Sequence, residues 1–222
     1  MKLLAGSRRK SVGTVAASVA GLLLAGCGGV HPGSAAVLDG DNITIKTVDD
    51  DAQSYCNYAL VVAKQSGVKD IATGDARKQA LSGLITADVA DKIAGEKGIV
   101  VAPKDYKLTP QEIASIEGAF PAKGLDGVKA IIEQSKKTSL IATSLGEQEL
   151  SVTADATNAE QVDAAGNKVI QDAIAASSLT IDPRFGLNKK TLEGTSGGSL
   201  SVAEVSDAEI DPADLHIGQR CS

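Results

Sequence analysis

The sequence predicts an α+β fold that is predominantly helical, with about five helices and short strands near both ends of the folded region. Aromatic residues make up 2% of the chain and tryptophan is absent, so the core must be aliphatic and rich in alanine, a composition that favours helices. Apolar residues recur at helical spacing through most of residues 47–177. Before and after this region, short β-prone runs are bounded by turn residues, which indicates strands.

The first thirty residues have the features of a bacterial lipoprotein signal. Residues 1–10 carry four basic residues and no acidic one, and residues 12–26 are uncharged. The uncharged run has the length of a signal-peptide core and is shorter than the ~20 apolar residues that a bilayer span needs. It ends in Leu24-Ala25-Gly26-Cys27, which matches the lipobox, an aliphatic residue and two small residues before the cysteine that takes the lipid. We therefore expect removal of residues 1–26 and lipidation of Cys27.

Lipid on Cys27 is predicted to anchor the protein to the outer face of the bacterial cell membrane, with residues 27–34 as a flexible tether of Gly, Pro and Ser. The alternative is an ordinary signal peptide with Cys27 merely nearby. The export route stays open. Ser7-Arg8-Arg9 resembles the start of a twin-arginine signal, whereas Ser11 stands where such a signal has a bulky apolar residue.

The charge balance limits the partners of the mature chain. Removing residues 1–26 takes four basic residues from the 22 in the chain and leaves 18 against 28 acidic ones, a net charge of −10. Such an acidic chain argues against nucleic acid as a partner and against broad electrostatic docking to anionic lipid. Residues 27–222 are enough for one domain, or for one domain and a small annex.

Cys56 and Cys221 remain besides the lipidated Cys27. Two cysteines outside the cytosol usually pair, so we expect a Cys56–Cys221 disulfide that fastens the C-terminal region to the first helix. The alternative is a reactive thiol, although neither residue has a base or a basic cluster nearby in the sequence.

A small hairpin, or a strand with a tight turn, and then a helix are expected at the start of the folded region. Residues 35–38 and 43–45 are short apolar runs on either side of the turn-forming residues 39–42. Thr47 is the expected N-cap of the helix that follows. Asp49, Asp50 and Asp51 would then occupy its first turn, where the helix dipole favours carboxylates. Apolar spacing continues to about residue 65, and Gly67 ends the helix.

Further helical segments are expected at about 75–97, 109–118, 124–149 and 158–177. Thr109-Pro110-Gln111-Glu112 opens the second of these with a cap residue, a proline at the first helical position and an acid at the third. In the third, the apolar periodicity slips at residues 136–139, so one helix and two helices both remain open. Residues 179–186 then predict a strand that enters a turn, and residues 187–222 a loop-rich tail pinned by Cys221.

No combination of residues indicates catalysis, a cofactor or a metal. The two histidines, His31 and His216, have no ligand-type residue at the spacing of a known site, and His216 is interpreted as a surface residue. The acids at 39–51 lack the Asp-x-Asp-x-Asp-Gly series of a calcium loop. Neither a phosphate-binding glycine motif nor a Gly-x-Ser-x-Gly elbow is present. We therefore expect a protein that is not an enzyme and needs no cofactor.

Two separated segments resemble parts of a known family. Ala36-Val37-Leu38-Asp39-Gly40, followed by Ile43-Thr44 and the acidic helix start, resembles the entry of SurA-type chaperone domains, although Asp39 replaces the commoner asparagine. Residues 181–186, Ile-Asp-Pro-Arg-Phe-Gly, resemble the strand that closes such domains in SurA- and PrsA-like proteins. Residues 35–186 are therefore similar to a SurA-type N-terminal domain. Actinobacterial lipoproteins with such a domain also carry a lipobox and a Tyr-Cys pair, here Tyr55-Cys56.

The resemblance implies that the first and last strands, about 140 residues apart, pair around the helical bundle. It also implies a chaperone-like function, the binding of unfolded or extended exported polypeptides in an apolar groove whose residues the sequence does not identify. Many members carry a parvulin isomerase domain, which would need roughly 90 further residues. Residues 187–222 are too few for it, so we expect binding without catalysis.

Two alternatives remain for the function. One is an envelope scaffold or accessory lipoprotein with a single dedicated protein partner. The other is a small-solute-binding lipoprotein, although that class normally has two α/β lobes and a longer chain.

Overall fold

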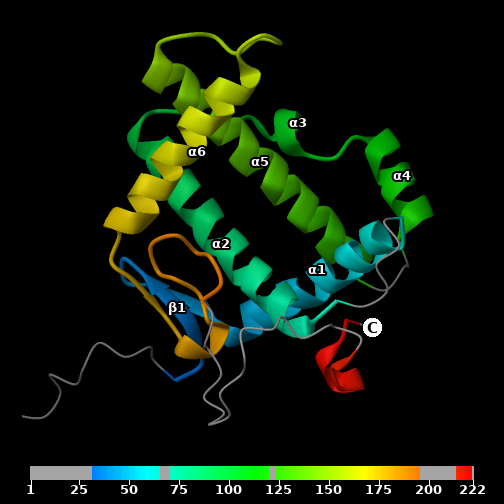
Figure 1. Ribbon diagram of the computed structural model, residues 1–222. Helices are drawn as coiled ribbons and strands as arrows, with labels where there is room; N and C mark the ends of the chain where they lie inside the picture. The colour runs from blue at the N-terminus through cyan, green and yellow to red at the C-terminus, as the bar shows by residue number, and fades with distance from the viewer. Residues whose placement is uncertain (1–31, 66–70, 121–123, 196–213, 222) are drawn as a thin grey trace, which may run out of the picture.

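The computed structural model describes residues 32–65, 71–120, 124–195 and 214–221. They form a mainly helical α+β fold (Figure 1), as the sequence predicts. The helices are α1 (Ile45–Gln65), α2 (Thr73–Glu96), α3 (Pro103–Tyr106), α4 (Pro110–Ala119), α5 (Leu125–Leu150) and α6 (Ala159–Ala176). The strands are β1 (Ser34–Leu38), β2 (Asp41–Thr44) and β3 (Leu179–Ile181), and two 3-10 turns are η1 (Pro183–Phe185) and η3 (Ile217–Gln219). The expected cleavage site, Cys27 and His31 lie outside the described residues.

β1 is the central strand of the sheet and joins the two ends of the fold. The strand order is β2-β1-β3, and both pairings are antiparallel. β1 and β2 form a hairpin whose turn holds Asp39 and Gly40 at positive φ, 50° and 98°, as a type I′ turn requires. On the other side of β1, Ala36 lies opposite Ile181. The predicted hairpin and the predicted pairing of the first and last strands are both confirmed.

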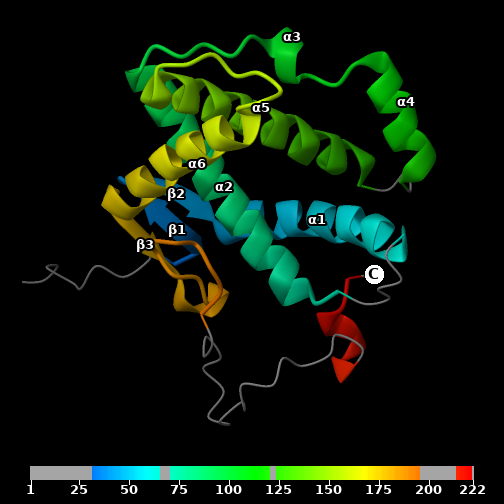
Figure 2. The same cartoon turned by 45° about the horizontal axis from the view of Figure 1, so that its top comes forward.

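The core is formed where α2 packs between the other long helices, and α2 runs through the middle of the helical body in Figures 1 and 2. Its residues Leu81 and Ile85 are fully buried. They belong to one cluster with Val48 of α1, Ile141 and Leu145 of α5, Ile170 of α6, and Ala35, Ala36 and Leu38 of β1. Burial of one large aliphatic side chain contributes about 1.5–3 kcal/mol, so helix packing is the main source of stability.

α5 and α6 cross at two glycines, Gly146 and Gly166. A Cβ atom on Gly146 would lie 1.9 Å from the carbonyl oxygen of Val162, and one on Gly166 would lie 1.7 Å from that of Ala142. No side chain fits at either position, so the two backbones are in direct contact. The glycines therefore set the distance between the two helices.

A disulfide joins Cys56 of α1 to Cys221, which confirms the predicted pair. Both residues are buried, and their Cα atoms are 5.2 Å apart. The N–H of Cys221 donates a hydrogen bond of 2.8 Å to the carbonyl of Ile71, and Arg220 forms a β-bridge with Ala72. Residues 214–221 are thereby attached both to α1 and to the residues that precede α2 (Figure 1).

The start of α1 differs from the prediction. The helix begins at Ile45, so Thr47 is not its cap. Instead the N–H of Thr47 donates a hydrogen bond of 3.1 Å to the hydroxyl of Thr44, the geometry of an N-cap at Thr44. The N–H of Ile45 donates to the carbonyl of Gly33, so the hairpin fixes where the helix begins. Residues 49–51 consequently lie beyond the first turn.

α5 is a single helix, which settles the question left open by the sequence. Lys136 and Lys137 form ion pairs with Glu112 of α4 at 2.9 Å and with Asp91 of α2 at 2.7 Å. The apolar periodicity slips at this turn because its side chains contact polar partners on neighbouring helices. The single-turn helix α3, opened by Pro103, is not predicted by the sequence analysis.

The first part of the predicted loop-rich tail packs on the domain. Leu187 forms a β-bridge with Gly194, and the N–H of Thr195 donates a hydrogen bond of 2.7 Å to the carbonyl of Gly186. Leu192 is buried within the core cluster. Residues 187–195 are therefore a folded loop that continues the domain.

Substitution of Gly166 by alanine is expected to lower the free energy of unfolding by about 1–3 kcal/mol, because the new methyl group must push α5 and α6 apart. Urea unfolding followed by circular dichroism measures the change. The matched control is Gly118→Ala on α4, where a Cβ atom meets nothing within 4 Å and the replacement should be neutral or stabilising. Equal stability of the two variants would contradict the close helix crossing.

Candidate functional site

A groove lies between α2, α5 and the segment that contains α3, which is residues 97–109 between α2 and α4. Its larger part, which we call the β2 cleft, has a volume of about 520 Å³. Its walls are Leu84, Ala87, Asp88 and Asp91 on α2, and Ala130, Glu133, Gln134 and Lys137 on α5. Each set has the spacing i, i+3, i+4, i+7, so each forms one stripe along its helix. Asn42, Ile43, Thr47, Tyr106 and Lys107 complete the lining.

A second hollow, which we call the Val100 cleft, follows further along the same two helices and has a volume of about 380 Å³. Its lining is more apolar, with Ala94 and Gly95 of α2, Ile141 of α5, and the chain from Ile99 to Val101. The side chain of Val100 is 89% exposed. The β2 cleft and the Val100 cleft together form the α2–α5 groove.

An ion pair divides the α2–α5 groove. Asp91 and Lys137 line both clefts, and Lys137 Nζ lies 2.7 Å from Asp91 Oδ2. Their side chains are 47% and 34% exposed, and an ion pair exposed to this degree contributes about 0–1 kcal/mol. An occupant that spans both clefts can therefore separate the two side chains at little cost.

The segment that contains α3 is held over α5 by Glu133. Its carboxylate accepts hydrogen bonds from Lys107 Nζ at 2.6 Å and from the backbone N–H of Leu108 at 3.1 Å. The bond from Lys107, together with that from Leu108, holds the pKa of Glu133 below its usual value. Glu133 thus stays charged at neutral pH and fixes one wall of the β2 cleft.

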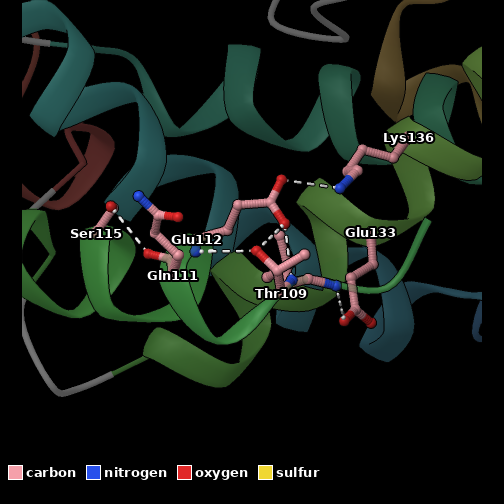
Figure 3. Close-up of polar contacts among 7 residues, drawn as sticks. Thr109, Gln111, Glu112, Ser115, Glu133 and Lys136 are labelled. Atoms are coloured by element: carbon pink, nitrogen blue, oxygen red, sulfur yellow. Dashed lines mark hydrogen bonds and ion pairs between the residues drawn. The ribbon is translucent and has the colours of Figure 1, made fainter. Parts of the chain in front are cut away.

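α4 begins with the capping box that the sequence predicts, drawn in Figure 3. The N–H of Glu112 donates to the hydroxyl of Thr109 at 3.3 Å, and the N–H of Thr109 donates to the Glu112 carboxylate at 2.7 Å. Lys136 of α5 donates to the other carboxylate oxygen at 2.9 Å. The bonds from Thr109 and Lys136 lower the pKa of Glu112 to about 2, so this carboxylate links α4 to α5.

The β2 end of the groove is acidic. Partial burial raises the pKa of Asp88, and the neighbouring carboxylates of Asp41 and Asp91 raise it further. Asp39 is paired with Lys92, whereas Asp41 and Asp88 have no ion-pair partner within the part of the chain that the structure describes. Lys92 also attracts Asp41 and Asp88, but one lysine there faces three carboxylates, so a cationic group that entered the β2 cleft would meet an excess of negative charge.

A smaller pocket of about 330 Å³ lies between α1, α2, α5 and α6 and is lined mostly by hydroxyl and amide side chains. Tyr55 closes it from α1, and burial together with Asp51 raises the pKa of its phenol. A Cβ on Gly83 would lie 2.7 Å from the phenolic oxygen of Tyr55, so this glycine makes room for the Tyr55 side chain.

The residues that the sequence analysis selected lie elsewhere. Cys56 and Cys221 form the disulfide and line none of these cavities, and His216 is exposed beside η3. The groove residues were not identified from the sequence. The signal that could have found them is the matching i, i+3, i+4, i+7 stripe of small and polar residues on α2 and on α5.

Comparisons with known proteins give no relative for this chain. No protein-family model matches it, and no curated protein and no solved structure has significant similarity to it. Among residues 32–65, 71–120, 124–195 and 214–221, no helix is both long enough and apolar enough to span a bilayer. In the same residues, no group of three or more His, Cys, Asp or Glu side chains is placed to hold a metal ion.

Substitution of Glu112 by glutamine is expected to destabilise the protein above about pH 4.5 and to have progressively less effect as the pH falls towards 2. The pKa of Glu112 is lower in the folded state than its usual value of 4.5, so its charged contacts stabilise the fold only while the carboxylate is ionised. Urea unfolding of both proteins over this pH range measures the difference.

The control is Glu160→Gln, which removes an acid from the first turn of α6 that forms no ion pair among the described residues. The difference in the free energy of unfolding between the wild type and the Glu160 variant should change less with pH. A constant difference for the Glu112 variant down to about pH 2 would contradict its role as a charged link.

Proposed function

We propose that the protein is a lipid-anchored, extracytoplasmic lipoprotein that binds unfolded or extended segments of exported polypeptides in the α2–α5 groove, without catalysis. The observation that carries the proposal is the pair of consecutive clefts along α2 and α5. One of them has an apolar lining and the exposed Val100, and the other has polar and charged walls. A polypeptide offers both kinds of group at every few residues.

The length of the groove suits a short piece of extended chain. Its lining residues on α2 run from Leu84 to Gly95, which at 1.5 Å per residue is about 16 Å. An extended chain rises about 3.3 Å per residue, so about five residues would fill the groove. Because small side chains such as Ala87, Ala94 and Ala130 form much of its walls, the groove has room for occupant side chains of different sizes.

The sequence supports the proposed location and the proposed class of client. The lipobox at Cys27 would keep the domain at the membrane surface, where exported chains emerge unfolded. The resemblance of residues 35–186 to SurA-type domains points to the same clients. The pairing of β1 with β3 agrees with the arrangement that this resemblance implies.

Replacement of Ala87 by glutamine is expected to weaken binding of an unfolded client about tenfold, because the longer side chain occupies the β2 cleft. The client is reduced α-lactalbumin whose cysteines are blocked with neutral carbamidomethyl groups, so that it stays unfolded, and fluorescence anisotropy measures its binding. The matched control is Ala175→Gln on an exposed position of α6, which should bind the client as the wild type does.

The same proteins are then compared for suppression of aggregation of a denatured client. Folded wild-type protein that gives no binding and no protection at several-fold molar excess would rule out the proposed function. Binding of one native envelope protein in place of unfolded client would favour the scaffold alternative. A large thermal stabilisation by a single metabolite would favour solute binding.

The Cys27→Ser variant is expected to lose membrane attachment, because a hydroxyl cannot form the thioether that carries the diacylglyceryl group. Mass spectrometry of the N-terminal peptide from a bacterial host measures the lipid on residue 27, and membrane fractionation measures the attachment. An unmodified Cys27 in the wild type would contradict the proposed anchor.

A further inference from the structure

The outer edge of β2 is an open strand edge. In an antiparallel sheet, the N–H and C=O of one residue point to the same side, and the side alternates along the strand. The N–H of Asp182 donates to Ala35 and the N–H of Asp39 donates to Ser178, so the odd-numbered residues of β1 face β3. The even-numbered residues of β1 therefore face β2.

This pattern places the backbone of Asn42 on the outer edge. Asn42 lies opposite Val37, whose N–H and C=O face β3, while its neighbours Asp41 and Ile43 lie opposite Leu38 and Ala36. The N–H and C=O of Asn42 therefore point away from the sheet. Within the described residues no backbone hydrogen bond outside the sheet is made by Asn42.

The open edge adjoins the β2 cleft. Asn42 and Ile43 line this cleft together with the α2 stripe that includes Asp88. A chain lying in the cleft thus has a strand edge on one side and the walls of α2 and α5 on the other. An open strand edge next to a cleft is the arrangement in which peptides bind by β-strand addition.

The charge at this end of the groove specifies the occupant further. Asp41 and Asp88 have no ion-pair partner among the described residues, and Asp39 and Asp91 each already have one lysine. Lys92 is the lysine that interacts with Asp39, Asp41 and Asp88, so a lysine or arginine side chain on the incoming segment would offset the remaining negative charge. A glutamate or aspartate at the same place would be repelled.

We propose that an extended client segment adds to the outer edge of β2 by hydrogen bonds to the backbone of Asn42 and directs a lysine or arginine towards Asp41 and Asp88. This inference rests on the proposed function and specifies its client class as short basic segments in extended conformation. The hydrogen bonds to the backbone of Asn42 fix the position of the client segment. The side chains on either side of the paired residue then lie in the groove.

The test uses the full chain with Cys27→Ser, a change outside the described residues, and two labelled eight-residue peptides of Ser, Thr and Val. One peptide has a central lysine and the other a central glutamate. We expect the protein to bind the lysine peptide about tenfold more tightly than the glutamate peptide in fluorescence anisotropy. Asp88→Asn should reduce this preference, and equal binding of both peptides by the unsubstituted protein would overturn the charge part of the proposal.

The backbone part is tested by Asn42→Pro, which removes the outward N–H but no hydrogen bond to β1, since proline is tolerated on the open side of an edge strand. We expect about tenfold weaker binding of the lysine peptide. Asn42→Ala keeps the N–H and loses only the side chain, so this variant should bind the lysine peptide only about twofold more weakly. Equal binding by the proline and alanine variants would overturn strand addition.

A second measurement covers the case in which Asn42→Pro unfolds the protein. Lysine peptides that are N-methylated at one backbone position at a time are titrated against the unsubstituted protein. At least one should bind about tenfold more weakly, because a methyl group blocks its hydrogen bond to the carbonyl of Asn42. If the protein binds unfolded client and Ala87→Gln weakens that binding, but no N-methylated peptide binds more weakly than the unmodified one, only this inference fails. If nothing binds, the proposed function fails as well.

Discussion

The pairing of β1 with β3 is the contact on which the arrangement of the helices depends, because it joins segments about 140 residues apart. Asp39 reinforces this pairing. Its N–H donates to the carbonyl of Ser178 at 3.1 Å, and its carboxylate accepts from the N–H of Ser178 at 2.9 Å. The entropic cost of closing such a loop grows only slowly with its length. The disulfide between Cys56 and Cys221 closes a second long loop, so the helical body is fastened at two separate places.

The α2–α5 groove exists because the segment over α5 is held differently from the rest of the fold. α2 contributes eight buried residues to the core, whereas α3 contributes none and α4 only Ile116. The segment with α3 and α4 is attached to α5 through the carboxylates of Glu112, Glu117 and Glu133. Surface contacts of this kind are worth little individually, so this wall belongs to the less stable part of the molecule. The groove therefore has two walls that belong to the core helices α2 and α5, and a third wall that is held to α5 by surface carboxylates.

The sequence predicted those elements that short motifs of neighbouring residues determine. The hairpin followed from Asp39-Gly40, and α4 followed from the Thr109 capping box. The predicted start of α1 was wrong because Thr44 and Thr47 are both good N-cap residues. Only the hydrogen bond from the N–H of Ile45 to the carbonyl of Gly33 decides between them. The groove was not identified because its stripes of alanine, acid and lysine look like a solvated helix face until α2 and α5 face each other. Location, clients and anchoring remain predictions.

The place of β1 at the centre of the sheet has a consequence for biosynthesis. A ribosome adds about 5–20 residues per second, so β1 is made on the order of 10 s before its partner β3. During that interval the nascent chain holds Ala35, Ala36 and Leu38, all buried in the finished protein, without the strand that pairs with β1. Each hydrogen bond between β1 and β3 must wait until residue 179 has been translated. Completion of the sheet is therefore a late event in the life of each new chain, whatever the order in which its helices form.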